Sequence, residues 1–128
     1  SANDWLLNSG RNLSDDSVAL LAKVKVYVEK HIKEEISIEE MVNEAGLSKS
    51  NFYRKLKSIT DYSPVDIVHL IRLRRAIHLI VHSGKTLSEA AYESGYNSLS
   101  YFSRIFVKYY HIPPSEWIKE KVGKSEKH

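Results

Sequence analysis

The chain has 128 residues, of which 42% are hydrophobic and 27% are charged, a balance that is typical of a folded domain and excludes a disordered segment. It contains no cysteine, which excludes disulfides and thiolate chemistry. No apolar run approaches the roughly eighteen residues of a membrane span, so we expect no membrane contact from this fragment.

The charge is unevenly distributed along the chain. Residues 1–46 carry five basic and nine acidic side chains, residues 47–85 carry eight basic and two acidic ones, and residues 86–128 carry six basic and five acidic ones. The overall net charge of +3 is too small to indicate a partner by itself. The middle segment, with a net charge of +6, is where a polyanion would be attracted.

The first thirteen residues show no hydrophobic period and are expected to form a linker or tail. The sequence begins Ser-Ala-Asn, without Met, and we expect a fragment whose natural protein continues upstream. Ser14 can cap a helix whose apolar positions recur at helical spacing to about Glu34. A capping-box pattern from Ser37 to Glu40 then predicts a short helix that ends at Gly46.

The next two predicted helices carry the basic segment. Ser48 can cap a helix over residues 49–59, and its apolar face is Phe52, Leu56 and Ile59. Pro64 stands at a first helical position and Asp66 in the first turn, which predicts a long helix over residues 64–83.

The last third of the chain predicts three more helices. A second capping box, Thr86 to Glu89, begins a short helix that ends at Gly95. Ser98 can cap a helix to about Tyr110. The two prolines at positions 113 and 114 restart the chain into a final helix to about Lys121, with a frayed tail over residues 122–128.

The second half of the chain repeats the first. Gly95 matches Gly46 at an offset of 49, and after one extra residue in the turn Arg104 matches Arg54 at an offset of 50. The same offset of 50 pairs Ser48 with Ser98, Phe52 with Phe102, Leu56 with Phe106 and Pro64 with Pro114. We therefore predict an all-α fold of about seven helices, with helix-turn-helix subdomains over residues 14–63 and 84–121 joined by a linker helix over residues 64–83.

The motifs of both halves resemble the DNA-binding domain of AraC/XylS-type transcription regulators. The second half is the more specific match and carries Ala90-Ala91, Gly95-Tyr96, Ser100-Tyr101-Phe102, Arg104 to Phe106, and Pro113-Pro114. The first half adds Phe52-Tyr53-Arg54-Lys55-Leu56 and Arg72 to Ala76. Within the family, the run over residues 52–57 resembles most the C-terminal output domain of a hybrid two-component regulator.

The resemblance implies the output domain of a bacterial transcription regulator, with double-stranded DNA as its partner. RNA polymerase is expected as a further partner, and the upstream domains of the same chain are expected to be missing here. The implied location is the cytoplasm, associated with the nucleoid, or a membrane-tethered full-length protein in the case of a hybrid sensor. A family member with an effector-binding domain upstream is the alternative.

Two recognition helices are then expected to enter successive major grooves, because a linker helix of about 20 residues is about 30 Å long and one turn of B-DNA is about 34 Å. Family correspondence and helical phase nominate as base-facing residues Ser50, Asn51, Tyr53 and Arg54 in the first helix and Leu99, Ser100, Ser103 and Arg104 in the second.

Each nominated residue has a specific chemistry and an alternative. Arg54 can grip a guanine through O6 and N7, Asn51 can pair with adenine, and Leu99 can meet a thymine methyl. The alternatives are a phosphate contact or salt bridge for Arg54, packing over the linker helix for Tyr53, and an ordinary exposed leucine for Leu99.

A second set of residues is nominated for phosphate contacts, which position a protein on DNA without reading sequence. Its members are the lysines Lys49, Lys55, Lys57 and Lys108, the hydroxyl of Tyr101, and the helix N-termini at Ser48 and Ser98. The alternative for each lysine is a solvated surface charge. Arg72 is expected to be an ion-pair or capping partner and not a base reader.

Two positions depart from the family pattern, which places glycine after each recognition helix. This chain has Asp61 and His111 there. Because Asp and His tolerate the left-handed conformation better than most residues, we expect some strain and an intact fold.

Other chemistry is weakly indicated. His78 and His82 are spaced to share a helix face, but no third metal ligand stands at a recognisable spacing. No phosphate-binding glycine loop or activated nucleophile is present, so we expect no enzyme activity, no catalytic residues, no metal and no cofactor.

The second hypothesis is a helical protein-interaction module that docks on RNA polymerase or a partner domain. The polar exposed faces of both recognition helices argue against it, because a docking helix would show an apolar patch.

Overall fold

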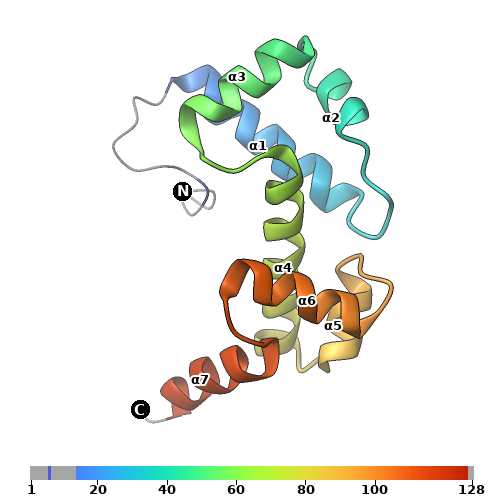
Figure 1. Ribbon diagram of the computed structural model, residues 1–128, viewed down its shortest axis with the longest axis vertical. Helices are drawn as coiled ribbons and strands as arrows, with labels where there is room; N and C mark the ends of the chain where they lie inside the picture. Colours follow the sequence, from blue (N-terminus) through green and yellow to red (C-terminus); the bar gives the residue numbers. More distant parts are fainter. Residues whose placement is uncertain (1–5, 7–13, 127–128) are drawn as a thin grey trace. The chain divides into compact units, whose positions relative to one another are not determined.

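The computed structural model describes residue 6, residues 14–122 and, for the backbone only, residues 123–126. This part of the chain consists of seven α-helices and contains no strand (Figure 1), which confirms the all-α class. The helices are α1 (Asp15–Lys30), α2 (Ile38–Glu44), α3 (Lys49–Ile59), α4 (Pro64–Ser83), α5 (Leu87–Glu93), α6 (Leu99–Tyr110) and α7 (Pro114–Glu126). The predicted tail over residues 1–13 lies outside the described residues except for Leu6, which is buried.

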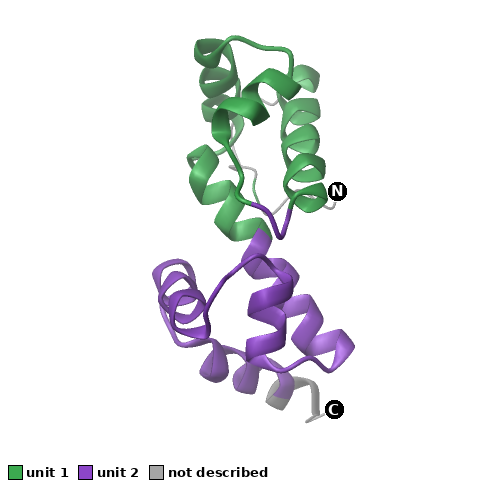
Figure 2. Ribbon diagram, turned by 90° about the vertical axis from the view of Figure 1, so that its right-hand side faces the viewer, with its two compact units in different colours: residues 1–31, 35–71 green, residues 32–34, 72–128 purple. Residues whose placement is uncertain are grey.

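The chain forms two compact units (Figure 2). Unit 1 comprises residues 1–31 and 35–71, and unit 2 comprises residues 32–34 and 72–128. The division falls inside α4, between Ile71 and Arg72, so the long helix contributes residues to the cores of both units.

Local capping signals begin the helices as predicted. In four helices the serine before the first turn accepts a hydrogen bond from the backbone N–H three residues later, and these serines are Ser14, Ser37, Ser48 and Ser98. Each bond satisfies one of the N–H groups that a helix N-terminus leaves unpaired.

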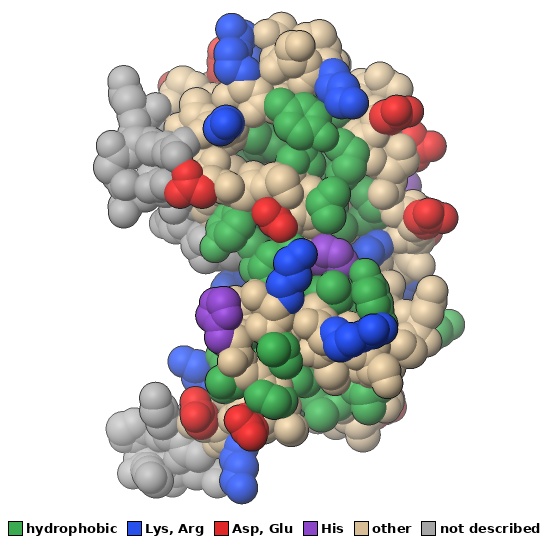
Figure 3. Space-filling view, in the orientation of Figure 1, with side chains coloured by type: hydrophobic (Ala, Val, Ile, Leu, Met, Phe, Trp, Pro, Cys, Tyr) green, Lys and Arg blue, Asp and Glu red, His purple; other side chains and the backbone are tan. Residues whose placement is uncertain are grey.

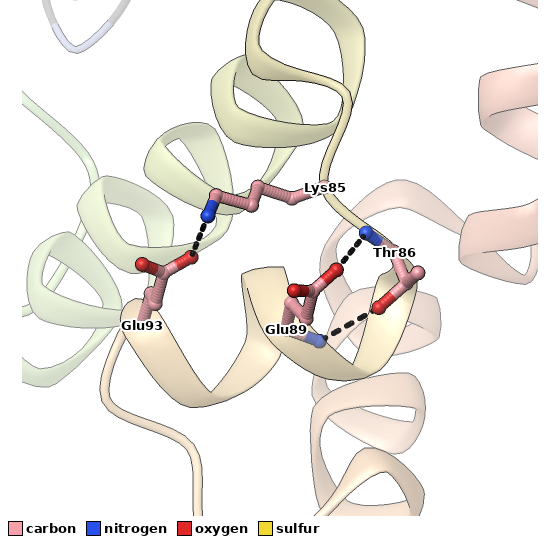
Figure 4. Close-up of polar contacts among 4 residues, drawn as sticks. All are labelled: Lys85, Thr86, Glu89 and Glu93. Atoms are coloured by element: carbon pink, nitrogen blue, oxygen red, sulfur yellow. Dashed lines mark hydrogen bonds and ion pairs between the residues drawn. The ribbon is translucent and has the colours of Figure 1, made fainter.

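The two predicted capping boxes differ in the structure. At α5 the box is complete, because Glu89 N–H donates to Thr86 Oγ1 over 3.1 Å and Thr86 N–H donates to Glu89 Oε1 over 3.0 Å (Figure 4). The bond from the Thr86 backbone holds the pKa of the Glu89 carboxyl below its usual value. At α2 the prediction of a full box is wrong: Glu40 Oε2 instead accepts a bond from the Tyr27 hydroxyl over 3.3 Å.

Replacing Thr86 by alanine is expected to lower the free energy of unfolding by about 1 kcal/mol, because α5 loses its side-chain cap. The measurement is urea unfolding followed by circular dichroism. Ser88→Ala is the matched control, since Ser88 is exposed in the first turn of the same helix. An equal loss in the two variants would show that the cap contributes nothing specific.

Two helix ends differ from the sequence-based expectation. α1 ends at Lys30 with His31 as its C-cap, although the apolar spacing continues to Ile32, and residues 32–34 belong to unit 2. α7 continues to Glu126, beyond the predicted end near Lys121.

Asp61 and His111, which stand after α3 and α6 where the family has glycine, differ in their backbone conformation. His111 adopts the left-handed conformation, with φ of 69°, as expected. Asp61 does not, and His111 is the one non-glycine with positive φ in the described part of the chain. α3 ends on an extended Thr60, whose hydroxyl accepts a hydrogen bond from Tyr62 N–H over 3.2 Å, so no left-handed residue is needed there.

Each unit has its own hydrophobic core. In unit 1, α3 packs against α1 and α2 and buries Phe52, Leu56 and Ile59 as predicted. In unit 2, α6 packs against α5 and α7 and buries Phe102 and Phe106. The ring of Phe106 stacks on Tyr110 with a centroid distance of 4.5 Å. The apolar face of each helix is therefore fixed by packing, and the opposite face is left to solvent.

Candidate nucleic-acid interface

Each unit contains one helix-turn-helix pair, α2 with α3 in unit 1 and α5 with α6 in unit 2. A glycine with positive φ stands in each turn, Gly46 at 71° and Gly95 at 97°. Glycine tolerates these conformations because it has no Cβ. A left-handed glycine thus precedes each predicted recognition helix, α3 and α6, as the sequence repeat predicts.

The nominated base-facing residues lie on the solvent side of these two helices. Asn51 and Ser103 are half-buried, and the exposed members are Ser50, Tyr53, Arg54, Leu99, Ser100 and Arg104. Both arginines stand clear of the cores, where long charged donors can reach a base edge or a phosphate. Their contact with DNA stays a prediction.

The apolar members of this set are partly exposed. Leu99 and Tyr53 are each 40% exposed. The ring of Tyr53 also packs edge-on against Phe52, with a centroid distance of 5.9 Å. Tyr53 therefore has one edge fixed by its own helix and the rest of its ring available to a partner.

The nominated phosphate contacts occupy the same sides of α3 and α6. Lys49, Lys57, Lys108 and Tyr101 are exposed and Lys55 is half-buried. The hydroxyls of Ser48 and Ser98 accept the capping bonds, so the groups that these positions can offer a phosphate are the N–H groups of the first helical turn. Figure 3 shows Lys and Arg side chains interspersed with Asp, Glu, His and hydrophobic side chains.

A hydrogen bond inside unit 2 joins Arg72 to the loop after α1, and the sequence indicated the arginine but not its partner. Arg72 Nη2 donates to the backbone oxygen of Glu34, in the loop after α1, over 2.6 Å. Partial burial lowers the pKa of the Arg72 guanidinium, against the opposing effect of Tyr96 and Tyr101. Burial also raises the pKa of the Tyr96 phenol.

Gly95 lies close to both Arg72 and the loop after α1. A Cβ built on Gly95 would lie 2.0 Å from the backbone oxygen of Ile32 and 2.9 Å from Arg72 Nε. The loop after α1 therefore lies directly against the turn that precedes α6. The signal that could have found this contact is weak, because Ile32 continues the helical period of α1.

The two histidines that the sequence places on one face of α4 lie next to each other. His78 and His82 face each other with ring centroids 4.9 Å apart, but no three potential metal ligands gather anywhere in the described residues. None of the helices described has the length and apolar character needed to cross a membrane. In each unit the nominated polar side chains lie on the solvent side of one helix, α3 in unit 1 and α6 in unit 2.

A family model described as "Helix-turn-helix domain" matches residues 41–120. Among curated proteins, the chain is 28% identical over 104 residues to histidine kinase P4 of Formosa agariphila, and the match covers 81% of this chain and 8% of that protein. It is 30% identical over 101 residues to the HTH-type transcriptional activator RhaS of Salmonella arizonae, and this match covers 79% of the chain and 36% of the relative. The chain thus corresponds to a minor part of either protein.

Among solved structures, a DNA-binding transcriptional dual regulator from Escherichia coli K-12 is similar, with a TM-score of 0.65 and 28% identity. The match covers 79% of this chain and 96% of that structure. Both helix-turn-helix pairs lie within the matched family model except for the first residues of α2.

Proposed function

Because the chain belongs to the AraC-type helix-turn-helix family, we propose that it is the output domain of a bacterial transcription regulator and binds double-stranded DNA sequence-specifically through α3 and α6. The observation that supports this proposal is the matching arrangement of α3 and α6. Each buries its apolar face in its own unit and carries an exposed arginine, Arg54 or Arg104, at the same position of the repeat.

The two helices are proposed to enter successive major grooves. One chain would then read two boxes about one helical turn apart, and because the two helices carry different side chains, the boxes need not be palindromic. Selection of bound duplexes from a random pool tests this directly. Two preferred boxes support the proposal, and a single box contradicts the role of one helix.

The whole protein is proposed to be a hybrid regulator, since the matched relatives include a histidine kinase of which this chain covers 8%. The match to an activator of which it covers 36% supports the second candidate, a regulator with an effector-binding domain. RNA polymerase as a further partner and a location in the cytoplasm, associated with the nucleoid, belong to the same proposal.

Duplex binding should be measured by fluorescence anisotropy at low and moderate salt. Affinity is expected to fall as salt rises, with a slope set by the number of phosphates that the protein neutralises. A chain that binds no duplex in a salt-sensitive manner would instead fit the protein-interaction module.

Replacing Arg54 or Arg104 by alanine is expected to weaken binding to the selected duplex by about 1–3 kcal/mol and to relax preference at one base pair. The measurement is competition among duplexes that differ at single positions. Arg75→Ala is the matched control, because Arg75 is an exposed arginine on α4, outside both recognition helices. An equal loss on all duplexes would assign the arginine to a phosphate.

A further inference from the structure

The two recognition helices hold their matching arginines in different ways. In α3, Arg54 Nη2 donates to Asn51 Oδ1 over 2.7 Å. In α6, the guanidinium carbon of Arg104 lies 5.8 Å from the ring centroid of Tyr101. In both helices the partner precedes the arginine by three residues, a spacing at which helical side chains are neighbours. At the same position of the repeat, the arginine therefore makes a hydrogen bond in α3 and a contact with an aromatic ring in α6.

The bond in α3 uses one of the two lone pairs of the oxygen that asparagine needs to read adenine. A guanidinium has donors only, so the amide atom that faces Arg54 is the oxygen. Pairing with adenine requires that same oxygen to accept a further bond from N6 while the amide nitrogen donates to N7, so the base would have to approach an amide whose orientation the bond to Arg54 already sets. Arg54 keeps further N–H donors that are free to grip a guanine. The geometry therefore favours Arg54 as the reader and Asn51 as its support.

The contact in α6 depends on a ring that the core holds in place. The Tyr101 ring lies 5.8 Å from the ring of Tyr96, which is 2% exposed. Tyr101 itself is 42% exposed, so one side of it is supported and another is open. A guanidinium within about 6 Å of an aromatic ring centroid is attracted by the ring quadrupole. Tyr101 can therefore restrict the directions that Arg104 samples.

We propose that Asn51 and Tyr101 are positioning residues that set the base preference of Arg54 and Arg104. This inference rests on the DNA-binding function proposed above and changes two of the assigned roles. Asn51 acts through Arg54 and does not read an adenine of its own. Tyr101 acts through the face of its ring and not through a bond from its hydroxyl to a phosphate.

A double-mutant cycle on the selected duplex tests the first pair. Asn51→Ala is expected to weaken binding about 2–10-fold, the value of one hydrogen bond, and to relax the same base pair as Arg54→Ala. The double variant is expected to bind no more weakly than Arg54→Ala. Relaxation at a different base pair, or losses that multiply in the double variant, would overturn the proposal.

Two substitutions of Tyr101 separate its ring from its hydroxyl. Tyr101→Leu removes the ring and is expected to weaken binding about 2–5-fold, with relaxed preference at the base pair that Arg104→Ala relaxes. Tyr101→Phe keeps the ring and is expected to retain that preference. Equal relaxation in the two variants would assign the role to the hydroxyl and overturn the proposal.

The outcomes also distinguish this inference from the proposed function. Loss of preference in the two arginine variants, together with relaxation elsewhere in Asn51→Ala and Tyr101→Leu, overturns the inference alone. Wild-type protein without salt-sensitive duplex binding overturns both. A lowered midpoint of thermal unfolding in the DNA-free variants, with uniform loss on all duplexes, would show a merely structural role and would also overturn the inference.

Discussion

Replacing Gly95 by alanine is expected to lower the free energy of unfolding by about 3 kcal/mol or more. Its φ of +97° is unfavourable for any residue with a Cβ, at a cost of about 1–3 kcal/mol. The new Cβ would also lie 2.0 Å from the backbone oxygen of Ile32, and forcing such a group into packed surroundings adds about 1–3 kcal/mol. Urea unfolding followed by circular dichroism measures the loss.

The other turn glycines provide matched controls. Gly46 and Gly84 have φ of +71° and +66°, but a Cβ on either would meet no atom within 4 Å. Their alanine variants are expected to lose only the backbone term, about 1–2 kcal/mol. If the three variants lost the same amount, the close approach of the Ile32 loop to Gly95 would contribute nothing to stability.

The Gly95→Ala substitution is also expected to disturb the proposed interface. Gly95 lies between α5 and α6, and Arg72, which contacts the same loop through Glu34, is 2.9 Å from the position of the new Cβ. The loop and the arginine would have to shift together. The support of the second recognition helix therefore depends on a contact that neither helix of the pair makes by itself.

Helix boundaries were predictable where neighbours in the sequence decide them. Ser48, Pro64 and Ser98 begin α3, α4 and α6 or stand one residue before them, because a cap or a preset φ acts over a single turn. The buried face of α3 followed from apolar spacing alone. Periodicity also identified which sides of α3 and α6 face solvent.

What escaped prediction depends on residues that are distant in the sequence. The loop after α1 contacts Arg72 and lies against Gly95, and no local pattern encodes these contacts. At α2 only the bond from Glu40 N–H to Ser37 Oγ forms, and the Glu40 carboxylate accepts from Tyr27, which lies on another helix. At the interface, spacing allowed the pair Asn51 and Arg54 to meet, but several rotamers compete on an exposed helix face.

Replacing Phe102 by alanine is expected to lower the free energy of unfolding by about 3–5 kcal/mol, the usual range for a buried phenylalanine. Its side chain is 0% exposed, and its ring lies 5.5 Å from Tyr96 and 5.9 Å from Phe106, measured between centroids. These rings belong to the same core cluster. Little else can fill the space, because the neighbouring Ala90 and Ala91 are small.

Val107→Ala separates loss of core packing from loss of apolar surface on the same helix. Val107 lies on α6 and is 41% exposed, so its truncation is expected to change stability by no more than about 0.5 kcal/mol. If both variants lost little, α6 would not depend on the Phe102 core. If Phe102→Ala alone is destabilising, duplex affinity should fall with it at temperatures near its unfolding midpoint, because the exposed face of α6 exists only while its buried face is packed.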